Sequence, residues 1–360
     1  AHQTDARTKK IRADAGKIEA LLLDEGVRAI PRQSEVIVLD FDATDDRIHG
    51  SQEGRFYHGY YGDYCYLPLY VFCGDIPLWA QLRTSDRDGS DGALEALRRI
   101  IPVLRERFGR HAIILVRADS GFCREAFMAW IESQPNVHYV LGLARNARLA
   151  QQLAPAFWES AAQLDEAAVL CARAAGAQEP PTLPGTARTF MEMRYQTLKS
   201  WSRERRVIGK AELLEGKANP RYLVTSLSGR EAWAQGHAWF RDAASLYEQC
   251  YCARGDMENR IKEQQMDLFA DRTSTGHMKS NQLRLWLSTF GYLLLRHLRA
   301  GALAGTRLAK ASAGTIRRHL MKVAAQVTVS VRRLHVRLSS AFPLQEVFAH
   351  AHRVLRQQTG

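Results

Sequence analysis

Short apolar runs separated by polar, glycine-containing stretches dominate the first half of the chain. The β-branched run from Val36 to Leu39 is typical of a central buried strand, and it ends in acidic residues. Two further runs flank Gly74-Asp75, a pair that predicts a tight hairpin. Strands are therefore predicted at 36–42, 64–73, 76–83, 113–116 and 137–143, and helices at 90–108 and 122–133.

The order of these elements predicts the fold class. Three leading strands, the last two forming the hairpin, are followed by a helix, a strand, a helix and a strand. The unit from 113 to 143 is a strand–helix–strand crossover, which requires parallel strands. We therefore expect an α/β protein with a mixed sheet flanked by helices, on the ribonuclease H-like plan.

The remainder of the chain departs from this rhythm. Residues 146–240 contain an alanine-rich helical part, a proline-rich loop and strand candidates at 189–195, 205–214 and 221–226. A long helix is expected from about Ala244 to Gln265, and the tail is expected to be mainly helical with one late strand around 327–338. We expect the following parts: 1–34, an N-terminal helix (6–23) and linker; 35–145, the first part of the catalytic core; 146–240, a β-containing insertion; 241–280, the core helix; and 281–360, a basic C-terminal region.

The charge of the chain is concentrated at its C-terminal end. The formal net charge is +12 over 360 residues. Residues 284–360 hold 13 Lys and Arg and one acid, Glu346, so this segment alone carries 13 − 1 = +12. A basic block on a neutral body indicates a surface for a polyanion, although a merely soluble basic surface has the same composition.

Cysteine spacing and hydropathy limit the other classes. None of the six cysteines forms a C-x-x-C pair, which favours reduced thiols over a zinc site, although Cys250, Cys252 and a distant histidine remain an alternative. The most apolar stretch, 283–298, is interrupted by Arg284 and Arg296, so we expect no membrane span. A cytoplasmic location is therefore expected.

Acidic residues follow two of the predicted core strands. Asp40 and Asp42 lie two residues apart on the first strand, so their side chains share a face. Asp119 follows the strand 113–116, at the carboxyl edge where ligands of α/β sheets gather. Buried neighbouring carboxylates are costly unless a cation compensates them. The alternative is that Asp42 caps its loop and that Asp119 is the N-cap of the next helix.

A third acid lies on the long helix after the insertion. At 100° per residue, Tyr251, Arg254, Glu258 and Lys262 fall on one side of this helix. An adjacent apolar stripe would dock on the sheet. A solvated face with a Glu258–Lys262 ion pair has the same spacing.

In the expected plan, Asp42, Asp119 and Glu258 converge. Three carboxylates at one point hold two divalent ions in phosphoryl-transfer enzymes, and oxygen ligands without Cys or His suit Mg²⁺, with Mn²⁺ as a substitute. The sequence therefore predicts that these residues are the catalytic residues and ligands of two metal ions. The residues alone leave Asp40 open as the first acid in place of Asp42, because both side chains share one face of the strand.

At these residues the chain resembles the DDE transposases of bacterial insertion sequences, and most closely the insertion sequence thirteen-eighty family within the insertion sequence four group. The resemblance runs from about 36 to 348. It rests on four segments: LDFDATDD (39–46), GRFYHGYYG (54–62), RADSGF (117–122) and ENRIKE (258–263).

The wider group carries a Tyr–x2–Arg–x3–Glu–x6–Lys signature on the helix of its catalytic glutamate. Tyr251, Arg254 and Glu258 match this signature, whereas Gln265 stands at the lysine position. Lys262 lies on the same helical face and is the candidate for that charge. The resemblance implies that Tyr251, Arg254 and Lys262 bind DNA.

The resemblance also implies a function. It implies cleavage of double-stranded DNA at transposon inverted-repeat ends and strand transfer into target DNA, by a protein that dimerises on DNA and associates with the bacterial nucleoid. Two alternatives share the pattern: an inactive DNA-binding remnant, and a ribonuclease H-like nuclease without strand transfer.

Overall fold

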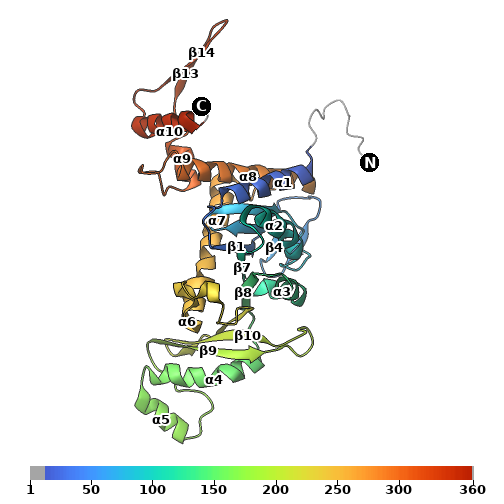
Figure 1. Ribbon diagram of the computed structural model, residues 1–360, viewed down its shortest axis with the longest axis vertical. Helices are drawn as coiled ribbons and strands as arrows, with labels where there is room; N and C mark the ends of the chain where they lie inside the picture. Colours follow the sequence, from blue (N-terminus) through green and yellow to red (C-terminus); the bar gives the residue numbers. More distant parts are fainter. Residues whose placement is uncertain (1–12, 359–360) are drawn as a thin grey trace.

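A computed structural model describes residues 13–358. The molecule is elongated, with a large mixed sheet and its flanking helices in the middle (Figure 1). The strands of this sheet are β1 (Val36–Ala43), β5 (Leu69–Cys73), β6 (Ile76–Gln81), β7 (Ile113–Ala118), β8 (Val137–Leu143), β9 (Thr186–Tyr195), β10 (Arg205–Leu214), β11 (Lys217–Ala218) and β12 (Arg221–Thr225). The expected mixed α/β sheet flanked by helices is confirmed.

Strand β1 lies in the centre of the predicted core. The order of the core strands is β6-β5-β1-β7-β8, in which β7 is parallel to both β1 and β8 and β5 is antiparallel to β1. The predicted hairpin at Gly74 joins β5 to β6. Because β1, β7 and β8 run in the same direction, their carboxyl ends meet at one edge of the sheet.

The two faces of β1 have different partners. Ile37, Leu39 and Phe41 belong to the main core, which includes buried residues of α1 (Ala15–Ala29), α2 (Ala93–Phe108) and α3 (Glu125–Glu132). Val36 and Val38 pack in a second cluster with residues of the later helical segment. Side chains alternate along a strand, so the acids at 40 and 42 lie on the face of this second cluster.

The segment after β8 extends the same sheet. Helices α4 (Ala147–Ala162) and α5 (Glu166–Ala174) come first, and α4 packs on β9 and β10. Strand β12 pairs antiparallel with β8, so β9–β12 prolong the core sheet rather than forming a separate one. The proposed limits of the insertion remain a prediction.

The long helix expected from Ala244 to Gln265 is a chain of short helical pieces. They are α6 (Ala243–Ser245), π-helical η4 (Leu246–Tyr251), 3₁₀-helical η5 (Cys252–Arg254), α7 (Gly255–Lys262) and π-helical η6 (Glu263–Asp267). The apolar stripe is buried as predicted, but a uniform 100° per residue does not hold between Tyr251 and Arg254. Turns of this kind occur often at functional sites.

The C-terminal region corrects one prediction. Helices α8 (Met278–Ala300), α9 (Ala313–His319) and α10 (Gln345–Gln358) are present, but the single late strand is a hairpin of β13 (Ala325–Val329) and β14 (Leu334–Leu338). The reversal carries no Gly, Pro or Asn. The Ser330 hydroxyl holds it by accepting from the backbone N–H of Arg333 at 3.1 Å.

Boundaries differ in the N-terminal half as well. The helix predicted at 6–23 runs from Ala15 to Ala29, while residues 6–12 lie outside the described part. Asp14 caps its N-terminus, and Pro31 disfavours a helical residue at position 30. The strand predicted at 64–73 divides at Pro68 into β5 and β4 (Asp63–Tyr66), because proline offers no N–H to a ladder. Strand β4 forms a small sheet with β2 (Asp46–Arg47) and β3 (Phe56–His58).

Two helix starts also differ from the prediction. The helix predicted at 90–108 begins after Gly92, which has φ of 78°, and no side-chain hydrogen bond caps its N-terminus. A 3₁₀ turn, η1 (Ser120–Phe122), precedes α3, which therefore begins later than predicted. Further 3₁₀ turns are η2 (Ala232–Ala234) and η3 (Ala238–Phe240). Within residues 13–358, no helix is both long and apolar enough to cross a bilayer.

Candidate active site

Asp40 is held by an arginine on the neighbouring strand. Arg117 on β7 donates from Nε to Asp40 Oδ1 at 2.7 Å and from Nη2 to Asp40 Oδ2 at 2.8 Å. Its Nη1 donates to the Cys250 carbonyl at 2.6 Å, which ties β7 to η4. The Asp40 side chain is 3% exposed. Burial raises the pKa of Asp40, and the Arg117 guanidinium opposes that rise. Both carboxylate oxygens of Asp40 are therefore occupied by the ion pair with Arg117, which joins β1 to β7.

Asp42 lies one pleat further along β1 and faces the helical segment. Its Oδ1 accepts from the backbone N–H of Ala43 at 3.0 Å, so it does form a local bond to the following backbone. Its Oδ2 lies 3.5 Å from Arg254 Nη1. Arg254 Nη2 also donates to Glu258 Oε1 at 3.2 Å. Arg254 thus bridges two of the three predicted acids, from a side chain that is itself 16% exposed.

Asp119 occupies the carboxyl end of β7, next to β1. Its Oδ1 accepts from the Gly121 N–H at 2.8 Å, so it caps the 3₁₀ turn η1 and not the α-helix that we weighed as an alternative. A Cβ at Gly121 would lie 3.0 Å from this oxygen, so a larger residue there would push the Asp119 carboxylate by a few tenths of an ångström. Asp119 is half-buried.

Gly142 on β8 allows the helical segment to approach Asp119. A Cβ at this position would lie 2.6 Å from the Tyr251 hydroxyl oxygen, 2.8 Å from the Ser120 nitrogen and 3.1 Å from the Asp119 carbonyl carbon. Tyr251 and the backbone of Asp119 therefore both approach Gly142, and both residues line the same cleft. A larger residue at 142 would force the helical segment away from the strand ends.

The carboxylates act on one another electrostatically. The pKa of Asp42 is raised to about 7, first because of burial and then because of the charges of Asp119 and Glu258, while Arg254 lowers it. The pKa of Arg254 is itself raised, because Asp42, Asp119 and Glu258 outweigh the effect of its burial. All three acids therefore lie within electrostatic reach of one guanidinium.

The acids do not form a closed cage. Among residues 13–358, no group of three or more His, Cys, Asp or Glu side chains is placed closely enough to hold a metal ion. Glu258 is 47% exposed, and the exposed Lys262 follows it by one turn of α7. The ion pair at this helix joins Glu258 to Arg254, four residues earlier, rather than to Lys262.

A cleft adjoins Asp119 on the carboxyl edge. Its volume is about 520 Å³, and Tyr247 and Tyr251 line it together with Arg145 and Arg221. Neither arginine carries a signal in the sequence, because the two come together only when β12 pairs with β8. Gln265, at the lysine position of the signature, donates to Asp46 Oδ1 at 3.1 Å and to the Asp45 carbonyl at 3.2 Å.

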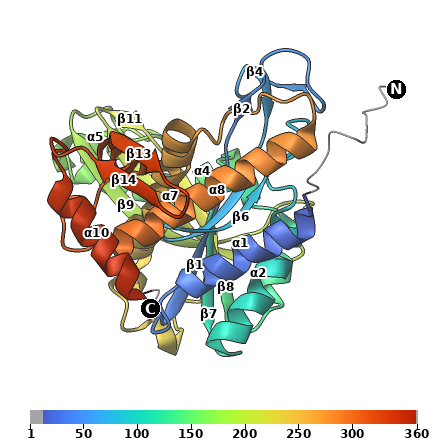
Figure 2. The ribbon, with the colours of Figure 1, turned by 90° about the horizontal axis from the view of Figure 1, so that it is seen from above.

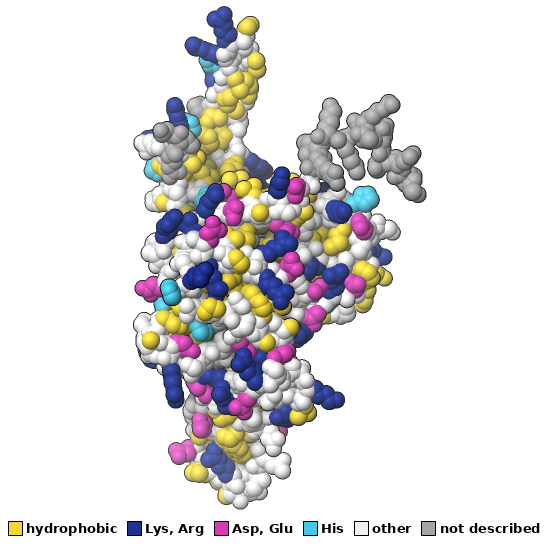
Figure 3. All heavy atoms as spheres, turned by 45° about the vertical axis from the view of Figure 1, so that its right-hand side comes forward, with side chains coloured by type: hydrophobic (Ala, Val, Ile, Leu, Met, Phe, Trp, Pro, Cys, Tyr) yellow, Lys and Arg dark blue, Asp and Glu magenta, His cyan; other side chains and the backbone are white. Residues whose placement is uncertain are grey.

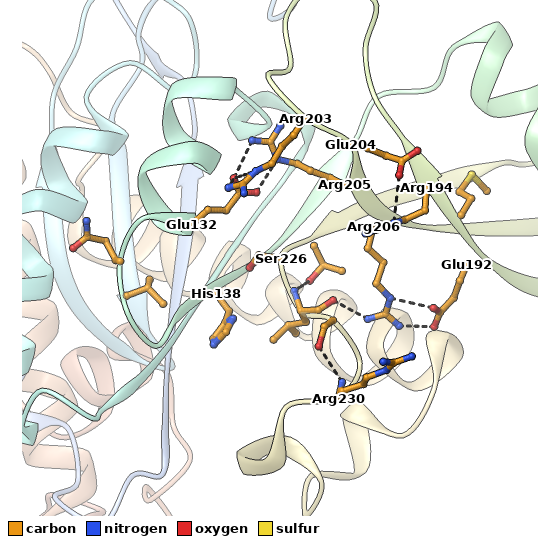
Figure 4. A pocket seen from close by; sticks show the side chains of 16 residues that line it. Glu132, His138, Glu192, Arg194, Arg203, Glu204, Arg205, Arg206, Ser226 and Arg230 are labelled. Carbon is orange, nitrogen blue, oxygen red and sulfur yellow. Dashed lines mark hydrogen bonds and ion pairs between the residues drawn. The ribbon is translucent and has the colours of Figure 1, made fainter.

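A larger hollow lies at the opposite edge of the sheet, where β8 begins (Figure 4). Its volume is about 990 Å³, and its arginines are mostly paired with glutamates. Arg206 pairs with Glu192, and Arg205 and Arg203 pair with Glu132.

Trp201, which lies among basic residues in the sequence, is only 6% exposed and stacks edge-on with Tyr195, so it is a packing residue rather than a DNA contact.

Comparison with known proteins identifies the family of this chain. The family model described as "Transposase DDE domain group 1" matches residues 2–359, and the chain therefore belongs to this family of DDE transposases. A search among curated proteins gives no match. One solved structure, of a piggyBac transposase synaptic complex with hairpin DNA, has 11% sequence identity and a TM-score of 0.41. The alignment covers 85% of this chain and 58% of that one.

The raised pKa of Asp42 predicts a dependence of stability on pH. The folded state keeps the proton up to about pH 7, whereas an ordinary Asp loses it near 3.8, so the unfolding free energy falls as pH rises between these values. Asp42→Asn removes this loss. In metal-free buffer, we therefore expect the stability of Asp42→Asn relative to wild type to increase between pH 4 and pH 8. The difference between the two unfolding free energies should change by up to about 4 kcal/mol over this range.

Denaturant titrations at the two pH values measure this difference. Burial also raises the pKa values of Asp40 and Asp46. These two residues contribute equally to the pH dependence of the unfolding free energy in wild type and variant, so their contribution cancels in the comparison. A difference that does not change with pH would show that Asp42 ionises normally.

Proposed function

We propose that this protein is a transposase that cleaves DNA at the inverted-repeat ends of its element and transfers the strand ends to target DNA. The observation that carries the proposal is the approach of Asp42 and Glu258 to one arginine, with Asp119 in electrostatic reach. We further propose that the five core strands form a ribonuclease H-like unit, and that the chain is of the insertion sequence thirteen-eighty type.

The donor set suits a divalent metal ion. Asp42, Asp119 and Glu258 offer only oxygen ligands, which is the preference of Mg²⁺ and Mn²⁺. Asp42 is buried with a pKa of about 7, so a nearby cation would favour its ionised form. These three residues would hold two ions, which when bound activate the attacking hydroxyl and stabilise the leaving oxygen of a phosphodiester. Asp40 is not assigned this role, because Arg117 occupies both of its oxygens.

Arg254 has two tasks in this proposal. Without substrate, its guanidinium neutralises Asp42 and Glu258. With DNA in the cleft, the same group is suited to bind a phosphate in a bidentate manner. Tyr251 beside Asp119 offers a ring for stacking on an unpaired base, and the exposed Lys262 offers a further charge. We expect two copies of the chain to act together on DNA.

The test uses labelled duplexes that carry the inverted-repeat ends, incubated with the full chain and Mg²⁺. We expect nicked strands followed by products joined to a target duplex. Cleavage without joined products would favour a nuclease, and a mobility shift without cleavage would favour an inactive DNA-binding protein.

A further inference from the structure

The β13–β14 hairpin is an exposed ribbon with one aliphatic face. Every residue of both strands is exposed, and the register sets Val327 opposite Val336 and Val329 opposite Leu334. Residues directly opposite each other in an antiparallel pair point to the same side. The aliphatic face consists of Ala325, Val327, Val329, Leu334, Val336 and Leu338. The other face carries polar and basic side chains, among them Thr328, His335 and Arg337.

Such a ribbon lacks the packing that a small sheet needs. A two-stranded hairpin alone is marginally stable in water, and contiguous aliphatic surfaces on soluble proteins mark interaction sites. Figure 1 shows the ribbon projecting away from the body beyond α9 and α10. In Figure 3 hydrophobic side chains run along it, with Lys and Arg side chains near its outer end. Its aliphatic face is therefore suited to pack on a partner surface.

Helix α8 presents a second uncovered apolar surface on the same chain. The helix buries Leu285, Tyr292 and Leu293, yet Leu287 is 63% and Leu294 is 70% exposed. These two leucines are seven positions apart, close to two helical turns, so they lie on one side of the helix. Between them Gly291 is open, since a Cβ there would meet nothing within 4 Å. Beside this stripe is a hollow of about 510 Å³, which is lined by Leu294, His297, Leu298, Ala300, Gly301 and Leu355.

The two surfaces match in length. Five residues of a strand span about 17 Å. The eleven steps from Leu287 to Leu298 along a helix span about 16 Å. Figure 1 shows α8 along the upper side of the body, the side from which the ribbon rises, and Figure 2 shows the same helix from above. A ribbon that points away from its own body leaves its own α8 stripe uncovered.

We propose that the ribbon of one copy of this chain packs with its aliphatic face on the α8 stripe of a second copy, and that the exchange is reciprocal about a twofold axis. The partner is a second copy because both apolar surfaces belong to this chain. DNA would bind the polar face with His335 and Arg337, and would leave the aliphatic face in water. The inference does not rest on the proposed chemistry, because the association is measured without DNA or metal.

Crosslinking tests the geometry directly. In a background of Cys171→Ser and Cys252→Ser, which removes the exposed cysteines, one chain carries Val329→Cys and a second, size-tagged chain carries Leu294→Cys. A short bis-maleimide should join the two chains when they are mixed, and should join neither chain to itself. A crosslink within a single chain that carries both changes, or a product from Val329→Cys alone, would overturn the proposed contact.

Sedimentation equilibrium of the full chain tests how much the aliphatic face of the ribbon contributes to dimer formation. Wild type should be dimeric at micromolar concentration, and Val327→Thr with Val336→Thr should raise the dissociation constant at least tenfold, on the order of 1.4 kcal/mol or more. Threonine keeps the β-branched shape, so the ribbon itself is retained. The matched control, Thr328→Ser with His335→Gln on the other face, should leave the constant unchanged. A monomeric wild type, or an aliphatic-face variant that stays dimeric and loses DNA binding instead, would refute the inference.

Discussion

Asp119→Asn should abolish DNA strand cleavage while DNA binding persists. The substitution keeps an oxygen that accepts from the Gly121 N–H, so the turn after β7 remains capped. It removes one of the three carboxylates proposed to hold the metal ions. Because metal stabilisation of the transition state contributes several kcal/mol, we expect a rate loss of roughly 1000-fold or more. Single-turnover cleavage of a labelled end duplex, with a mobility-shift titration in parallel, measures both quantities.

Asp256→Asn is the matched control for that experiment. Asp256 is an exposed acid on α7 two residues before Glu258, so its loss changes the local charge without removing a proposed ligand. We expect its cleavage rate to stay within a few-fold of wild type. Equal losses in both variants would mean that general charge, rather than metal binding at Asp119, sets the rate. Unchanged cleavage by Asp119→Asn would refute the assignment of this residue.

Arg205→Met should be the most destabilising of the substitutions considered. The Arg205 side chain is 2% exposed and binds two glutamates of α3, with Nη1–Oε2 at 2.7 Å to Glu125 and Nε–Oε1 at 2.7 Å to Glu132. Removing it leaves Glu132, 9% exposed, without its principal counter-charge. Breaking a buried ion pair from one side costs about 3–5 kcal/mol. Chemical denaturation at pH 7 measures the change in unfolding free energy.

Arg203→Met provides the comparison. Arg203 pairs with the same Glu132 but is 58% exposed, and exposed pairs contribute about 0–1 kcal/mol. The double variant Arg205→Met with Glu132→Met should recover much of the loss, since no buried charge is then left unpaired. If Arg205→Met costs no more than Arg203→Met, the link between α3 and β10 is not a stabilising feature.

The core sheet was predictable because its signals are local and periodic. A few neighbouring residues are enough to predict each of three features: the strand at 36–39, the turn at Gly74 and the crossover around α3. The elements whose predicted form was wrong depend on less regular signals. The ribbon turn at Ser330 uses a side-chain hydrogen bond instead of glycine, and the π and 3₁₀ turns around Tyr251 leave no mark on hydrophobic periodicity.

The candidate site was only partly accessible to the same reasoning. Alternation along β1 placed Asp40 and Asp42 on one face, but it gave no means of separating their roles. That separation comes from the register, which sets Asp40 beside Arg117 on the parallel strand β7. The bridge from Arg254 to Asp42 likewise joins residues 212 positions apart (254 − 42).

The sequence by itself determined the order and type of the core elements, the basic C-terminal block and the candidate acids. Each of these follows from local composition or from the periodic spacing of apolar positions. The tertiary structure decided which acid is neutralised by Arg117 and which faces Arg254. It also revealed that Gly142 admits Tyr251 and that the ribbon has an uncovered aliphatic face. These features depend on contacts between distant segments, and the free energy of such contacts is set by register and burial rather than by neighbours along the chain.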